Sequence, residues 1–114
     1  MSDDNGRRAE TLARDFLCRR GLVFVEQNWR SRFGEIDLIL RDGECIVMVE
    51  VRLRTNVRFG GPGESIHAHK RRRFLAAARQ YLSRYPRAMG RIDAVLLNRL
   101  DPPERNSTTG EPVR

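Results

Sequence analysis

The spacing of apolar residues changes along the first half of the chain, and each spacing predicts a different element. In residues 6–20 apolar side chains recur every three or four positions, which predicts an amphipathic helix. Residues 22–29 are rich in β-branched and aromatic side chains and predict a strand. Two more apolar runs follow, separated by Asp42-Gly43, a dipeptide typical of tight β-hairpin turns. The first half therefore predicts a helix and three strands.

The second half predicts one helix and one strand. Residues 55–64 are glycine-rich and predict a loop. Ser65 is a suitable N-cap for a helix over residues 66–84. Residues 91–98 are mostly apolar and predict a buried strand. Residues 101–114 are rich in Pro, Ser, Thr and charged residues and predict a disordered tail.

This order predicts one α/β domain over residues 1–100, with a mixed central sheet flanked by helices. The helix between the third and fourth strands favours a parallel pairing of those two strands, because a crossover connection is needed there. No apolar run is long enough to span a membrane, and the polar N-terminus does not resemble a signal peptide. We therefore expect a cytoplasmic protein without a membrane partner.

The predicted hairpin has two different faces, because side chains alternate along a strand. If Asp42-Gly43 is a two-residue turn, Asp37 lies opposite Met48, and Glu35 lies opposite Glu50. Asp37 and Glu50 are then diagonal neighbours about 7–8 Å apart at Cα. Asp37 and Glu50 share one face of the predicted hairpin. The opposite face is expected to be entirely apolar and carries Ile36, Leu38, Leu40, Cys45, Val47, Val49, Val51 and Leu53.

The clustered carboxylates of Asp37 and Glu50 have two possible interpretations. Asp37 and Glu50 are close enough to share one divalent cation, and oxygen ligands of this kind suit Mg²⁺ or Mn²⁺. Alternatively, they pair with neighbouring arginines such as Arg52 and Arg54 and form a solvated charged patch. The residues alone do not decide between a metal site and salt bridges.

A net charge of +7 favours nucleic acid as the partner, because a basic surface attracts phosphate polyanions. Four consecutive cations begin the second predicted helix and point around it in different directions. Trp29 and Phe33 flank arginines before the hairpin, where they either stack on exposed bases or, for Trp29, belong to the core. The residues expected to contact nucleic acid, most simply DNA, are Lys70, Arg71, Arg72, Arg73, Arg54 and Arg32.

Several segments together resemble a known family. They are "GRRAETLARDFL", "NWRSRFGEIDLI", "VMVEVRLR" and "HKRRRFLAAARQYL", which cover most of residues 6–98. Their combination is similar to the YraN-like bacterial family of the restriction-endonuclease-like superfamily, whose fold is related to archaeal Holliday-junction resolvases. The resemblance implies a restriction-endonuclease-like α/β fold and, by analogy with the resolvases, a homodimer.

The resemblance also implies roles for individual residues. Asp37 and Glu50 match the metal-binding carboxylates of the superfamily, and Glu10 matches an acidic residue that approaches the metal in related resolvases. Arg52 stands where the superfamily has a catalytic lysine. Arginine does not act as a general base because its pKa lies above 12, but it still stabilises charge on a phosphate.

Three functions follow as alternatives. The first is a divalent-metal-dependent nuclease that hydrolyses phosphodiester bonds of DNA, with Asp37, Glu50, Arg52 and Glu10 at the catalytic site. The second is a nucleic-acid-binding module without cleavage, which the arginine at position 52 favours. The third is an adaptor whose basic face binds an acidic protein.

Overall fold

The computed structural model describes residues 4–54, 62–98 and 107–113. The described elements are α1 (Asp4–Arg19), β1 (Val23–Ser31), β2 (Gly34–Asp42), β3 (Cys45–Arg54), α2 (Pro62–Leu82), β4 (Met89–Asn98) and β5 (Ser107–Val113). The strands form one sheet in the order β1-β2-β3-β4-β5. β3 and β4 are parallel, and the other neighbours are antiparallel. The predicted mixed α/β architecture is confirmed.

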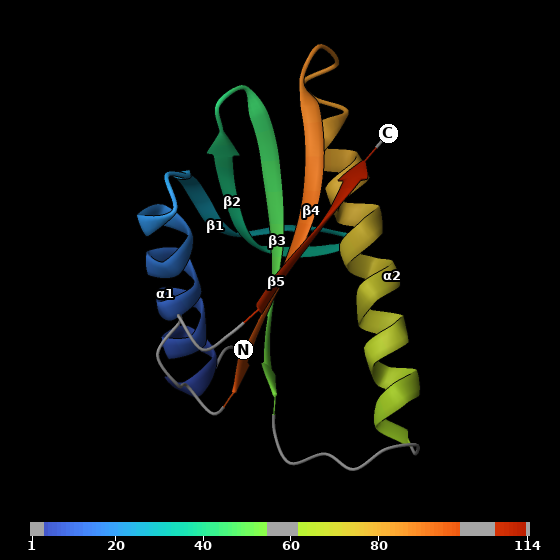
Figure 1. Cartoon of the computed structure of the whole chain (residues 1–114). Helices are drawn as coiled ribbons and strands as arrows, with labels where there is room; N and C mark the ends of the chain where they lie inside the picture. Colours follow the sequence, from blue (N-terminus) through green and yellow to red (C-terminus); the bar gives the residue numbers. More distant parts are fainter. Residues whose placement is uncertain (1–3, 55–61, 99–106, 114) are drawn as a thin grey trace.

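The sheet lies between the two helices, with α1 on one face and α2 on the other (Figure 1). Each helix covers its own apolar cluster, because alternate residues of the central strands point to opposite faces. The α1 cluster includes Ala13, Phe16, Leu17, Leu38, Leu40, Val47, Val49, Val95 and Leu97. The α2 cluster includes Ile36, Ile39, Met48, Phe74, Ala77, Ala78, Tyr81 and Ile92.

The β2–β3 hairpin turns one residue later than predicted. Asp42 pairs with Cys45, so Gly43 and Glu44 form the turn, and Gly43 has a φ of 63° that suits glycine. The prediction that Asp42-Gly43 forms the turn is therefore wrong. Moving the turn by one residue shifts each pairing by two positions, which keeps every side chain on its predicted face.

Ile36 is the exception to the predicted apolar face, because it packs with α2 and not with α1. The β1–β2 ribbon bends strongly, with an irregular register between Phe24 and Glu26 and a φ of 57° at Asn28. This bend turns the far end of the ribbon towards α2. There Trp29 packs edge-on against Tyr81 with ring centroids 5.2 Å apart, which places Trp29 in the core.

Two further boundaries differ from the sequence prediction. α2 begins at Pro62, within the predicted glycine-rich loop, because proline is well tolerated in the first turn of a helix. Ser107–Val113, predicted to be disordered, forms β5 at the edge of the sheet, where it pairs with β4. Among the described residues, neither helix combines the length and the apolar composition of a transmembrane segment.

Candidate functional site

The candidate site lies where β2 and β3 diverge. Their pairing ends at Leu38 and Val49, after which β2 follows β1 towards α2 and β3 continues beside β4 (Figure 1). Asp37 is the first residue of β2 beyond this point. Its Oδ2 accepts a hydrogen bond of 2.8 Å from the backbone N–H of Val51. Asp37 and Glu50 therefore each lie just beyond the last paired residues of β2 and β3.

Glu50 is buried on the face of β3 that α2 covers, with 7% of its surface exposed. Its Oε1 lies 3.2 Å from Nη2 of Arg52 and 3.5 Å from Nη1 of Arg71. A buried carboxylate is costly unless it is paired, and these two guanidiniums supply the pairing. The prediction that Glu50 lies opposite Glu35 is wrong, because the pairing of β2 with β3 ends at Leu38 and Val49. Glu35 instead forms an ion pair of 2.9 Å with Arg30 of β1.

The third predicted acid, Glu10, reaches the same region from α1. It is 8% exposed, and its Oε1 accepts a hydrogen bond of 3.3 Å from Nε2 of Gln27. Oε1 of Gln27 in turn accepts a hydrogen bond of 3.5 Å from Nη1 of Arg14. Gln27 was not predicted as a site residue, because it stands between two other polar residues of β1, Glu26 and Asn28, and nothing in the sequence distinguishes it from them. It orients Glu10 by holding one of the two carboxylate oxygens.

Asp37 is the most perturbed carboxyl of the site. Its pKa is raised to about 7: burial raises it most, the hydrogen bond from the Val51 N–H lowers it, and the negative charges of Glu10, Glu35 and Glu50 add to the rise. The four acids therefore lie close enough to interact electrostatically, although they come from α1, β2 and β3. A carboxyl that titrates near neutral pH in such a cluster is typical of functional sites.

A buried carboxylate elsewhere in the sheet provides a comparison. Asp93 is 3% exposed, and both of its oxygens accept hydrogen bonds from Arg91, at 2.9 Å and 3.1 Å. This pairing with Asp93 is the main reason that the pKa of Arg91 is raised. Oδ2 of Asp37 accepts a hydrogen bond from a backbone N–H and not from a guanidinium. The negative charge of an ionised Asp37 is therefore less fully compensated than that of Asp93.

The chemistry of the site fits Mg²⁺ or Mn²⁺ bound jointly with a phosphate. Among the described residues, no three His, Cys, Asp or Glu side chains are arranged as ligands of one ion. Mg²⁺ is commonly held by only one or two carboxylates, with waters and substrate phosphates completing its coordination. Asp37 and Glu50 are the two carboxylates that would hold it, and the crowding of negative charge around Asp37 favours a cation there.

Comparisons with known proteins agree over nearly the whole described domain. The sequence profile of the Uncharacterised protein family UPF0102 matches residues 9–97. The chain belongs to the UPF0102 family. It is 47% identical over 96 residues to a UPF0102 protein of Methylobacillus flagellatus, covering 84% of this chain and 85% of that protein. It is 53% identical over 94 residues to a UPF0102 protein of Nitrosospira multiformis, covering 82% and 79% of the two chains.

The basic residues predicted to contact nucleic acid separate into two groups in this UPF0102 domain. Arg71 points to Glu50 and belongs to the carboxylate site. The side chains of Arg32, Lys70, Arg72 and Arg73 are exposed, whereas that of Arg54 lies outside the described residues. The sequence analysis correctly expected that the four cations of α2 do not all face one way.

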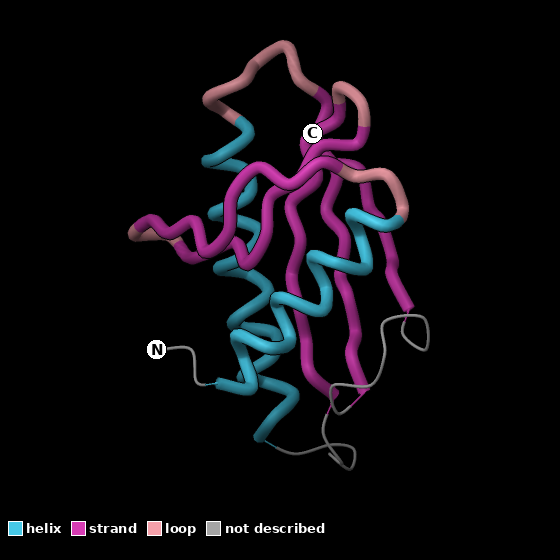
Figure 2. The backbone as a smooth tube through the Cα atoms, turned by 90° about the vertical axis from the view of Figure 1, so that its left-hand side faces the viewer, coloured by secondary structure: helices cyan, strands magenta, loops and turns pink. Residues whose placement is uncertain are grey.

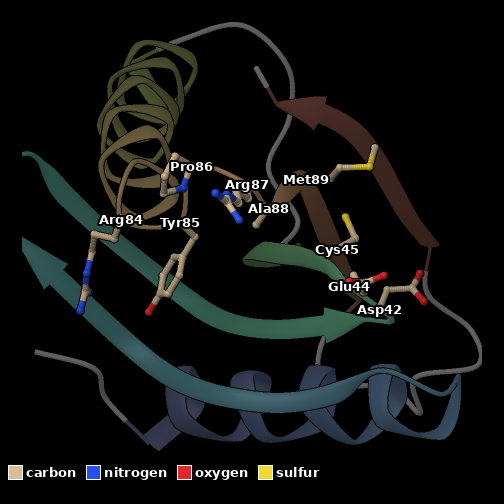
Figure 3. Close-up of a pocket in the computed structure, with 9 residues that line it drawn as sticks. All are labelled: Asp42, Glu44, Cys45, Arg84, Tyr85, Pro86, Arg87, Ala88 and Met89. Atoms are coloured by element: carbon tan, nitrogen blue, oxygen red, sulfur yellow. The ribbon is translucent and has the colours of Figure 1, made fainter.

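A cavity of about 840 Å³ lies away from the carboxylates of the candidate site, Asp37, Glu50 and Glu10 (Figure 3). It is formed by Asp42, Glu44 and Cys45 at the β2–β3 turn and by residues 84–89, which connect α2 to β4. Asp37, Glu50 and Glu10 do not line it. The cavity is therefore separate from the candidate site of the UPF0102 domain.

Proposed function

We propose that this UPF0102 protein is a divalent-metal-dependent nuclease with a restriction-endonuclease-like fold that hydrolyses phosphodiester bonds in DNA. The observation that carries the proposal is that Asp37 lies close enough to Glu50 to interact with its charge, while two arginines contact Glu50, where β2 and β3 diverge. Buried acids flanked by cations fit a site that binds both a metal ion and a phosphate, because each charge is costly without its partner.

Each residue has a distinct task in this proposal. Asp37 and Glu50 bind the cation, and Glu10, oriented by Gln27, adds negative charge beside Asp37. A bound Mg²⁺ or Mn²⁺ supplies a polarised phosphate and an activated water. Arg52 and Arg71 have side chains about one-third exposed, at 31% and 32%, so their guanidiniums are accessible to a phosphate while they contact Glu50.

The test is an incubation of the protein with linear duplex, single-stranded and four-way-junction DNA in the presence of Mg²⁺ or Mn²⁺. We expect cleavage that requires the cation and disappears in Asp37→Ala, because that substitution removes one of the two metal ligands. Asp15→Ala is the matched control, since Asp15 is an exposed carboxylate of α1. Activity that survives in Asp37→Ala would come from a contaminant or another site and would contradict the proposal.

The second candidate function is DNA binding without cleavage. It is favoured by the two guanidiniums at Glu50, which compensate that carboxylate without a metal ion. This module would bind DNA with an affinity that falls steeply as salt rises, because phosphate contacts release counterions. Salt-dependent binding without hydrolysis in any of the three DNA forms would select this function over the nuclease.

A further inference from the structure

The tip of the β1–β2 hairpin presents an aromatic ring at the surface. The tip is formed by Arg32 and Phe33, between the ends of β1 and β2, and it projects from the body of the molecule (Figure 2). Phe33 is 43% exposed. The guanidinium of Arg32 lies 5.1 Å from the centre of its ring. The ring is therefore available for stacking, and a planar cation already lies beside it.

The base of this tip is held against α2. Gly34 is buried, and a Cβ at this position would overlap the backbone carbonyl oxygen of Arg73. Only glycine allows so close an approach of the two backbones. The ion pair between Arg30 and Glu35 at 2.9 Å braces the hairpin beside the tip. Phe33 is therefore fixed next to α2 and is not at the end of a free loop.

The surface beside the tip is basic. Arg73, where Gly34 contacts α2, has an exposed side chain, and so has Lys70, which lies three residues earlier on the same face of the helix. The chain runs only four residues along β2 from Phe33 to Asp37, which is at most about 14 Å. The exposed aromatic ring thus lies only a short stretch of chain away from Asp37 of the candidate site.

This combination suits a nucleic acid whose bases are accessible. Bases stack on exposed aromatic rings in a sequence-tolerant way, and neighbouring cations hold the phosphate backbone. In an intact duplex each base is covered by its neighbours, so an exposed ring gains no stacking partner there. The tip would therefore distinguish unpaired from paired DNA, a distinction that the cations alone cannot make.

We propose that Phe33 is a stacking platform for an unpaired base and that the UPF0102 domain prefers DNA with single-stranded character. This inference rests on the proposed DNA binding and adds the class of substrate. Arg32, Lys70 and Arg73 bind the phosphates on either side of the stacked base.

The experiment measures dissociation constants for a single strand and a duplex of equal length at one salt concentration. The wild-type protein is expected to bind the single strand more tightly. Phe33→Ala is expected to weaken single-strand binding by roughly 5- to 100-fold and to leave duplex binding unchanged. Phe33→Trp, which retains a stacking ring, is expected to keep the single-strand preference.

Phe24→Ala is the matched control. Phe24 is 38% exposed and has the guanidinium of Arg14 at 5.2 Å from its ring, so it resembles the Phe33–Arg32 pair but lies at the other end of β1. It is expected to change neither affinity. Equal single-strand binding by the wild type and Phe33→Ala, or an equal loss of both DNA forms, would overturn the stacking role. Failure of the wild type to bind either DNA form would instead overturn the proposed function.

Discussion

Replacing Asp37 with asparagine is expected to stabilise the protein at neutral and alkaline pH. The pKa of Asp37 is raised from 3.8 to about 7, first by burial and then by the nearby negative charges of Glu10, Glu35 and Glu50. The folded protein therefore keeps this proton up to about pH 7, whereas the unfolded chain releases it near pH 3.8. The wild-type protein should lose stability as pH rises through this range, because its unfolded state binds fewer protons than its folded state.

The expected effect is large. The difference in the free energy of unfolding between Asp37→Asn and the wild type should grow by roughly 4 kcal/mol between about pH 4 and pH 8. Asparagine carries no charge, and its side-chain oxygen still accepts the hydrogen bond from the Val51 N–H. Denaturant unfolding of both proteins at several pH values measures this difference directly.

Asp15→Asn serves as the control because it removes an exposed carboxylate from α1. A difference between Asp37→Asn and the wild type that stays constant with pH would show that Asp37 is not buried among like charges. A difference in the free energy of unfolding that grows with pH would mean that the folded protein retains a carboxyl group whose ionisation lowers its stability. Such a cost is typical of functional residues, whose arrangement is selected for activity and not for stability.

The second large effect concerns Arg52. Its guanidinium contacts Glu50 at 3.2 Å, and in the proposed nuclease it takes the place of a catalytic lysine. A guanidinium does not release its proton, whereas a lysine in a partly buried site can orient or deprotonate the attacking water. If this site is a weakened nuclease, Arg52→Lys should raise the rate of DNA cleavage on the order of 100-fold.

The rate is measured as the initial rate of cleavage of one DNA substrate in Mg²⁺ at a fixed salt concentration. Arg41→Lys makes the same exchange at an exposed position near the β2–β3 turn, and it should leave the rate unchanged. An Arg52→Lys protein that still binds the cation but gains no activity would argue that cleavage is not the task of this domain. It would then favour the DNA-binding module.

The position and faces of the β2–β3 hairpin were predictable because they depend on local patterns. The alternation of apolar and polar residues fixed which side chains face α1 and α2, and a change of two positions in the pairing does not alter it. The Asp42-Gly43 signal located the turn, but it does not specify which of its residues occupy the two central positions. For this reason the alternation over Leu38–Leu40 and Val47–Val49 was predicted correctly, whereas the register of the pairing was wrong.

The bend that completes the site was not predictable from the same patterns. It depends on Asn28 in a left-handed conformation and on the irregular register near Phe24. Neither is marked by a glycine or a proline in β1. The bend carries Ile36 to the α2 side and brings Gln27 to Glu10. β5 was missed because its pairing with β4 uses backbone groups, which polar residues supply as well as apolar ones.

The most direct test of the account is a titration of the protein with Mn²⁺, followed by the broadening of its backbone amide NMR signals. Binding between Asp37 and Glu50 predicts that signals around these two residues broaden first, at low metal concentration. The same signals should stay sharp in Asp37→Asn. Broadening spread over the exposed carboxylates, or broadening around Glu50 that is unchanged in Asp37→Asn, would contradict a shared metal site at this point of the sheet.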